Sequence, residues 1–146
     1  MAEVNQSVLV PYSAAQMFEL VDAVERYPEF LPWCAASELI DRNDAELRAA
    51  LHVNFRGIKQ KFSTRNSRSA PHAMGIQLVE GPFKALEGAW KFIPLSDAGC
   101  KVEFRLSWEF SSRLLASLAG PVFNHIALTM VDAFVKRAES LYGRSA

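Results

Sequence analysis

The sequence predicts an α+β fold in which an antiparallel sheet of about seven strands wraps around a long C-terminal helix, with one or two short helices after the first strand. Between residues 34 and 110, apolar side chains alternate with polar ones, which is typical of strands with one dry and one wet face. From residue 112 to 142 the apolar residues recur every three or four positions, which indicates an amphipathic helix. Laying this helix across the concave side of the sheet would bury both apolar surfaces.

The length and composition indicate one globular unit. The chain has 146 residues, and we expect residues 1–146 to form a single domain. Half of the residues are hydrophobic and 22% are charged, as in ordinary globular proteins. The first residues contain no basic region followed by an apolar block, and the two cysteines are isolated. We therefore expect a protein of a reducing compartment, the cytoplasm.

The first 34 residues predict a strand, a capped helix and a stiff loop. Residues 4–10 alternate as a strand does. Ser13 and Gln16 have the spacing of a capping box, so a helix should start there and end near residue 21 or 24. The following stretch, YPEFLPWC (27–34), contains two prolines, which exclude a regular helix or an interior strand. Its aromatic residues are costly to expose, so this loop should close over part of the interior.

The rest of the chain predicts six further strands and the terminal helix. We expect strands near residues 37–41, 47–55, 58–64, 74–78, 86–94 and 100–110, with a tight turn at Arg56-Gly57. Gly120-Pro121 interrupts the helical pattern, which predicts a short helix followed by a long one with Pro121 in its first turn. The expected apolar stripe of the helical region consists of Leu115, Leu118, Val122, Ile126, Met130, Phe134, Ala138 and Leu141.

Charge is distributed unevenly although the net charge is zero. Residues 1–46 hold nine acidic and two basic side chains, whereas residues 47–79 hold six basic side chains and no acidic one. Two interpretations stay open: an anionic partner such as RNA or a phospholipid surface, or a solvated strand face balanced by the acidic first third. We favour the second, because no net positive charge supports the first.

The sequence offers few candidates for catalysis or metal binding. His52, His72 and His125 lie far apart, and no pair has the spacing of metal ligands. The sequence also has no Gly-rich phosphate loop and no nucleophile elbow. His125 neighbours the apolar stripe and is the one histidine with a plausible view of the interior, and we favour a structural role for it over that of a catalytic base. The sequence therefore predicts a protein that is not an enzyme and holds no metal.

Aromatic residues are abundant, with 10 Phe, 3 Tyr and 3 Trp. Many of them fall on the predicted dry face of the sheet or in the two proline loops. Ordinary core packing explains such residues, but a curved sheet and one helix also enclose a deep space that can stay open as an apolar cavity. In that case Phe30, Trp33 and Phe83 would form its mouth. Periodicity alone leaves both alternatives open.

Three segments resemble a known family. YPEFLPWC (27–34), GPFKALEGAWKF (81–92) and GPVFNHIALTMVDAFVKRA (120–138) are similar to segments of bacterial RatA-type proteins and mitochondrial coenzyme Q-binding proteins, in the START-like, helix-grip superfamily. The resemblance covers nearly the whole chain. It implies a Bet v-like, seven-stranded antiparallel sheet wrapped around the C-terminal helix and enclosing a hydrophobic tunnel.

The resemblance implies two functions, of which we expect the first and keep the second as the alternative. The first is a non-catalytic quinone chaperone that binds ubiquinone or another polyprenyl lipid in the tunnel, supports respiration and contacts the inner membrane transiently. The second is a toxin-like translation regulator that binds the large ribosomal subunit and blocks subunit association. Members have also been labelled oligoketide cyclases or dehydrases, but the chain has no evident acid–base set for that chemistry. No DNA binding is expected, and no cofactor other than the bound lipid.

The resemblance and the periodicity together suggest site residues. The lipid tail would lie along the last helix and under the inner face of the sheet, with the two proline loops as a gate. The expected cavity and gate residues are Tyr27, Phe30, Trp33, Phe83, Trp90, Phe104, Trp108, Ile126, Met130 and Phe134. The candidate contacts with RNA or the ribosome are Arg56, Lys59, Lys61, Arg65 and Arg68.

Overall fold

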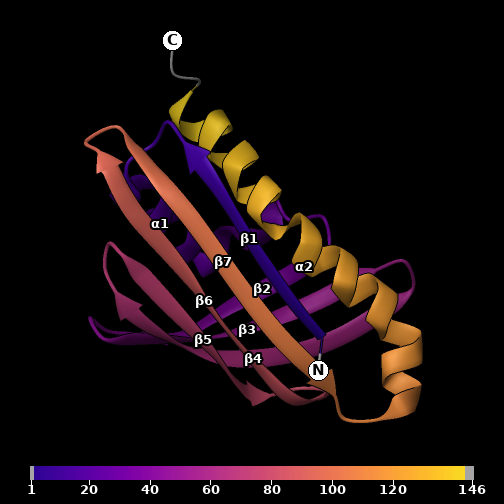
Figure 1. Cartoon of the computed structure of the whole chain (residues 1–146). Helices are drawn as coiled ribbons and strands as arrows, with labels where there is room; N and C mark the ends of the chain where they lie inside the picture. Colours follow the sequence, from indigo (N-terminus) through magenta and orange to yellow (C-terminus); the bar gives the residue numbers. More distant parts are fainter. Residues whose placement is uncertain (1, 144–146) are drawn as a thin grey trace.

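The structure, a computed structural model, describes residues 2–143 and contains a single seven-stranded antiparallel sheet within them (Figure 1). The strands are β1 (Ala2–Val10), β2 (Cys34–Arg42), β3 (Glu46–Phe55), β4 (Ile58–Ser69), β5 (Ala73–Glu80), β6 (Phe83–Ser96) and β7 (Gly99–Phe110). Their order across the sheet is β1-β7-β6-β5-β4-β3-β2, so the first strand pairs with the last and the others follow as hairpins. The predicted fold class is confirmed.

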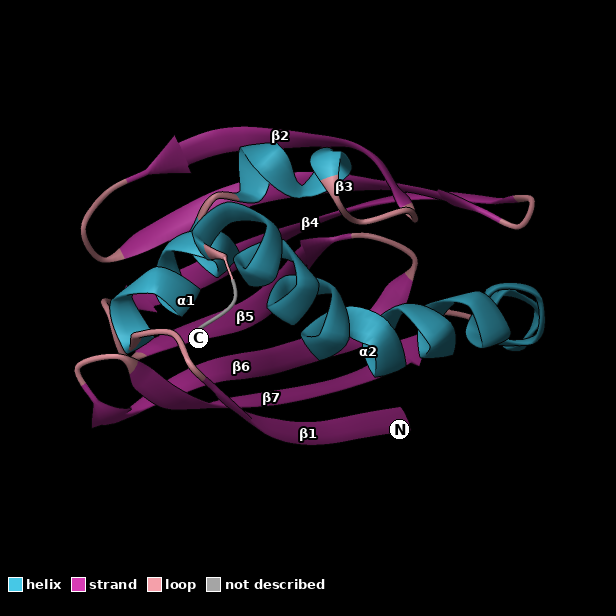
Figure 2. Cartoon of the chain, turned by 90° about the horizontal axis from the view of Figure 1, so that it is seen from above, coloured by secondary structure: helices cyan, strands magenta, loops and turns pink. Residues whose placement is uncertain are grey.

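The sheet curves around the C-terminal helix α2 (Arg113–Tyr142), which lies along its concave side (Figure 2). Two short helices, α1 (Ala14–Asp22) and the 3₁₀ helix η1 (Val24–Glu29), follow β1. Helix α1 packs between α2 and strands β5–β7, and η1 packs against β2. The core therefore lies between the inner face of the sheet and these three helices.

The start of α1 follows the predicted capping box. The Ser13 N–H donates to Gln16 Oε1 at 2.9 Å, and the Gln16 N–H donates to Ser13 Oγ at 3.1 Å. The segment after α1 differs from the expected loop, because Tyr27, Pro28 and Glu29 belong to η1. A proline is compatible with a 3₁₀ turn, since its fixed φ lies within the 3₁₀ range and it removes only one hydrogen bond.

The expected break at Gly120-Pro121 is wrong, because α2 continues through both residues. Pro121 deprives the Ser117 carbonyl of its partner, but Ser117 lies on an exposed part of the helix where water can replace the bond. The first turns of α2 bend away from the line of the rest (Figure 1), as expected near an internal proline. The stripe is also partly wrong: Leu118 and Leu141 are 58% and 52% exposed, and Ala119 faces the sheet instead of Leu118.

Helix α2 is unusually apolar for a helix with a solvent-facing side. By length and composition alone it could cross a bilayer, since one 18-residue window has a mean hydropathy of 1.6. The core helix of a soluble protein meets the same criterion. A third of that window is buried in this structure, where the helix packs its inner side against the sheet.

Candidate functional site

An apolar cavity of about 70 Å³ lies between the inner face of the sheet and α2. Its walls come from α1, η1, strands β3 to β7, α2 and the segment that holds Trp33. Seven of the ten expected residues line it: Tyr27, Trp33, Trp90, Phe104, Ile126, Met130 and Phe134. The alternation of the strands and the period of α2 place these side chains on facing surfaces, which is why the sequence predicted them.

Trp33 and Phe30 occupy the side of the cavity nearest η1. Trp33 is 2% exposed and lines both the cavity and a surface groove between η1 and α2, so its side chain lies between the two. Phe30 lines only the groove, where its ring contacts Phe134 edge-on at 5.0 Å and lies beneath the Arg137 guanidinium at 4.9 Å. This arrangement is compatible with the expected gate at residues 27–33.

Phe83 and Trp108 do not line this cavity. Both rings pack on Phe123, at centroid distances of 4.9 and 5.0 Å, in a separate aromatic cluster. A second void of about 10 Å³ lies beside Phe83, and Phe62 and Phe123 contribute to the walls of both voids. The two proline loops therefore do not form one mouth, because the Phe62–Phe123 pair stands between them.

The cavity is small for a lipid. Sites for drug-sized ligands usually enclose about 300–1,000 Å³, well above the 70 Å³ found here. Of the two alternatives left open by periodicity, this conformation is closer to a filled core. A polyprenyl chain would need α2 and the η1 segment to separate from the sheet.

Two polar residues in the cavity wall were not predicted as site residues. Thr64 and Asn66 on β4 line the cavity and are 5% and 6% exposed. They continue the inward-facing alternation of Phe62, but the expected strand ended at residue 64. The sequence could have identified Asn66 if the alternation of inward-facing residues had been continued two residues beyond Thr64.

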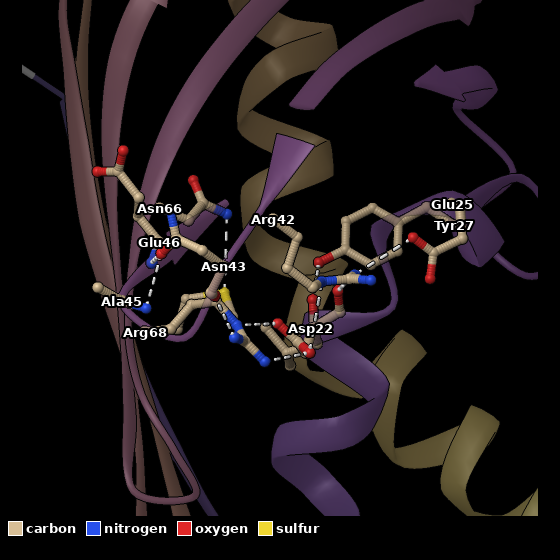
Figure 3. Close-up of polar contacts among 11 residues, drawn as sticks. Asp22, Glu25, Tyr27, Arg42, Asn43, Ala45, Glu46, Asn66 and Arg68 are labelled. Atoms are coloured by element: carbon tan, nitrogen blue, oxygen red, sulfur yellow. Dashed lines mark hydrogen bonds and ion pairs between the residues drawn. The ribbon is translucent and has the colours of Figure 1, made fainter. Parts of the chain in front are cut away.

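An ion-pair network holds the end of α1 against the sheet (Figure 3). Arg68 Nε and Nη2 donate to Asp22 Oδ1 and Oδ2 at 2.7 and 2.9 Å, and Arg68 Nη1 donates to the Asn43 carbonyl at 2.6 Å. Arg42 Nη2 donates to the Asp22 carbonyl and to Glu25. The hydrogen bond with Asp22 raises the pKa of Arg68. We call Asp22, Arg42, Asn43 and Arg68 the α1 latch.

The latch corrects the expectation that Arg68 contacts RNA. Its side chain is only 14% exposed, and three of its N–H groups already donate to protein oxygens. An arginine held in this way is not available to a phosphate without breaking a bidentate pair. Arg68 therefore belongs to the structural contacts of α1, beside the cavity wall formed by Val21 and Asn66.

The latch should contribute measurably to stability. We expect Asp22→Asn to lower the free energy of unfolding by about 1.5–3 kcal/mol, because it weakens charge-assisted hydrogen bonds to a largely buried guanidinium. Urea unfolding followed by tryptophan fluorescence measures the change. Glu25→Gln serves as the control, since the Glu25 side chain is 43% exposed and should change stability by less than about 1 kcal/mol. Equal effects of the two variants would contradict this role of Asp22.

Buried polar groups near η1 are kept in their neutral forms. The Tyr27 hydroxyl donates to the Val21 carbonyl, and burial raises the pKa of this phenol. Burial also raises the pKa of the Cys34 thiol to about 11. Neither group is therefore a nucleophile or base at neutral pH.

A basic patch occupies the outer face of the sheet, on β3 and β4. Lys59, Lys61 and Arg65 alternate along β4 and are exposed, and Arg48 lies directly opposite Arg65 on β3. We call these four residues the outer basic patch. Glu46 pairs with Arg65 at 3.4 Å, which reduces the positive potential at that end. Arg56 stands apart in the β3–β4 turn, with its guanidinium 4.9 Å from the Phe55 ring centroid.

The histidines do not gather at the cavity. His52 Nε2 lies 2.9 Å from Glu38 Oε1 on the outer face, and this hydrogen bond, with the charge of Lys61, lowers the pKa of Glu38. His125 stacks on Phe55 and lines the surface groove rather than the cavity. Residues 2–143 contain no group of three or more His, Cys, Asp or Glu side chains placed to hold a metal ion.

The sequence matches the family described as polyketide cyclase / dehydrase and lipid transport, over residues 10–135. The chain belongs to this family. The description covers both enzymes and lipid transport, so membership alone leaves the activity open. The family match and the fold confirm the resemblance on which the sequence-based expectations rest.

Two relatives in the family cover almost the entire chain. The ribosome association toxin RatA of Vibrio cholerae is 45% identical over 143 residues, which cover 98% of this chain and 99% of that protein. The mitochondrial coenzyme Q-binding protein COQ10 homolog B of Xenopus laevis is 33% identical over 146 residues, which cover 97% of this chain and 60% of that protein. The chain is thus more similar to the toxin than to the quinone-binding protein.

Solved structures of the family's fold include cyclases. The Zhui aromatase/cyclase of a Streptomyces species superimposes with a TM-score of 0.83, covering 94% of this chain and 93% of that one, at 15% identity. An identity this low supports the helix-grip fold alone. The family relatives of higher identity are named as toxins rather than as enzymes.

Proposed function

We propose that this family member associates with the large ribosomal subunit and blocks its joining to the small subunit. The observation that carries the proposal is the 45% identity with a ribosome association toxin along 99% of that protein's length. The aligned region spans 98% of this chain, so it takes in the sheet, the helices and the loops. The site of action would be the cytoplasm.

The outer basic patch supports an interaction with ribosomal RNA. Lys59, Lys61 and Arg65 project from one face of β4, with about 7 Å between Lys59 and Lys61 and about 14 Å between Lys61 and Arg65. A row of cations of this length can reach several phosphates of an RNA backbone, and lysine and arginine are the usual phosphate contacts. The turn residue Arg56 extends the surface beyond the end of the strands.

Co-sedimentation with purified subunits tests the proposal. The protein is mixed with large or small subunits and centrifuged through sucrose at a series of salt concentrations. We expect binding to the large subunit alone, with an affinity that falls steeply as salt rises, because phosphate contacts release counterions. Equal binding to both subunits, or no binding at low salt, would contradict the proposal.

A second candidate function is binding of an apolar ligand in the cavity, with a prenyl lipid such as ubiquinone as the expected class. The cavity and its seven expected lining residues favour it, and a relative is named as a coenzyme Q-binding protein. Burial would supply the affinity, at about 25 cal/mol per Å² of apolar area before the costs of ordering and opening. Delivery of such a ligand would require transient contact with a membrane.

Met130→Asp tests the cavity function. The Met130 side chain lines the cavity, so a carboxylate there should abolish ligand loading because its charge would be buried against an apolar tail. Loading is measured by mass spectrometry of solvent extracts from protein purified from a quinone-producing bacterium. Leu128→Asp is the control, since Leu128 is on the same helix and 49% exposed. Lipid retained by Met130→Asp protein would show that the cavity is not the binding site.

A further inference from the structure

Asn66, a residue of the cavity wall, carries a buried hydrogen-bond acceptor that has no partner among the described residues. Its side chain lines the cavity from β4 and is 6% exposed. Its Nδ2 lies 3.7 Å from Met74 Sδ, whereas its Oδ1 is buried and has no hydrogen-bond partner among the described residues. Figure 3 shows the Asn66 oxygen pointing away from the latch residues Arg68 and Asn43.

The orientation of the amide follows from its neighbour. A thioether sulfur is a weak acceptor and cannot donate, so the NH₂ group must be the one that faces Met74. The carbonyl oxygen of Asn66 is therefore the atom without a hydrogen-bond partner. A buried acceptor without a donor costs about 1–3 kcal/mol, and native proteins contain few of them. An acceptor of this kind in a cavity wall indicates that a donor from outside the chain completes it.

The surroundings of Asn66 restrict what that donor can be. Thr64 and Asn66 are the two cavity-lining residues that are neither apolar nor aromatic, and both lie on β4. The rest of the wall is formed by aliphatic and aromatic side chains, including Val21, Ile76 and Trp90. A complementary molecule has one small polar group at this wall and hydrocarbon elsewhere.

We propose that Asn66 is the polar subsite of the cavity and accepts a hydrogen bond from the hydroxyl of an otherwise apolar ligand, such as a prenyl alcohol, a phenol or a quinol. The proposal rests on the second candidate function, binding of an apolar ligand. It adds the requirement that the polar end of the ligand donates a hydrogen bond. A head with carbonyl oxygens alone would place two acceptors against each other at Asn66 Oδ1.

Three probes with one carbon skeleton test the subsite: geraniol, its methyl ether and the matching hydrocarbon. Binding is followed by quenching of tryptophan fluorescence, since Trp33 and Trp90 line the cavity. In a purely apolar cavity the ether should bind more tightly than the alcohol, because it leaves water more readily. We expect the reverse order, with the alcohol bound about tenfold more tightly than the ether.

Asn66→Leu provides a second readout that a purely structural asparagine would not give. The variant should lose the preference for the alcohol and, without ligand, melt about 2–6 °C higher, because a buried unsatisfied oxygen is removed. Ser67→Ala is the control on the same strand and should retain the preference, because the Ser67 side chain is exposed and does not line the cavity. If the Asn66→Leu variant does not fold, the order of affinities of the three probes for the unmodified protein decides the question.

The outcomes separate the subsite from the cavity function. Tighter binding of the ether than of the alcohol to the unmodified protein would overturn the subsite and show that water or the chain satisfies Oδ1, while the cavity function would stand. An unchanged alcohol preference in a folded Asn66→Leu variant would overturn it in the same way. Failure of all three probes to bind would overturn the cavity function and the subsite together.

Discussion

Reversing Lys59, Lys61 and Arg65 to glutamate is expected to weaken binding to the large ribosomal subunit by two orders of magnitude or more. Each reversal removes a phosphate contact and introduces repulsion, and these contacts supply most of the affinity of a salt-dependent complex. The slope of log affinity against log salt should also become shallower. Co-sedimentation with purified large subunits at several salt concentrations measures both quantities.

A matched control uses other charges on the same side of the sheet. Lys91, Lys101 and Arg105 lie on β6 and β7, outside the outer basic patch, and their reversal changes the net charge by the same amount. This variant should bind within about tenfold of the unmodified protein, because its charges act only at long range. Similar losses in the two variants would show that net charge, and not the patch, governs binding.

Replacing Phe123 with alanine is expected to cost about 3–5 kcal/mol of stability. The Phe123 ring is 6% exposed and contacts the rings of Phe62, Phe83 and Trp108 at 6.2, 4.9 and 5.0 Å. Its removal should also join the two voids that it separates. Urea unfolding measures the loss of stability, and binding of the hydrocarbon probe should become stronger because less opening is needed.

Leu114→Ala is the control for Phe123→Ala. Leu114 is on the same helix and 69% exposed, so the change should stay within about 0.5 kcal/mol. A stability loss near 1 kcal/mol for Phe123→Ala would mean that the aromatic cluster relaxes around the missing ring. Unchanged hydrocarbon binding in a folded Phe123→Ala variant would contradict the description of Phe123 as a partition.

The strands were predictable because side-chain alternation reports which face of a strand is buried. Their ends were less so: β4 extends to Ser69, five residues beyond the expected end, because backbone pairing with β5 continues past the apolar residues. The break at Pro121 was mispredicted because it, too, depends on the three-dimensional surroundings of the backbone. The pattern locates a proline, but whether a helix tolerates it depends on the solvent exposure of one carbonyl.

The cavity lining was predicted better than its surroundings. Periodicity identifies inward-facing residues such as Phe104 and Met130, but it does not reveal which aromatic rings meet. Phe83 was assigned to the gate because it sits in a proline loop, and only its packing on Phe123 shows otherwise. Arg68 was assigned to the basic surface because its partner, Asp22, is 46 residues away in the sequence.

The two proposed functions use opposite faces of the sheet. The outer basic patch and the cavity wall alternate along the same strand, with Lys61 and Arg65 outward and Phe62, Thr64 and Asn66 inward. Because neighbouring residues of a strand point to opposite sides, each face can be changed without altering the other. The patch reversal should therefore leave ligand binding intact, and Met130→Asp should leave ribosome binding intact.

Light scattering shows whether the protein prevents the two ribosomal subunits from joining. Purified large and small subunits are mixed with and without a molar excess of the protein, and the rise in scattering is followed. We expect the protein to suppress the rise when it is added to large subunits first, and the variant with Lys59, Lys61 and Arg65 reversed to glutamate to leave the rise unchanged. Normal joining in the presence of excess unmodified protein would contradict the claim that this family member blocks subunit association.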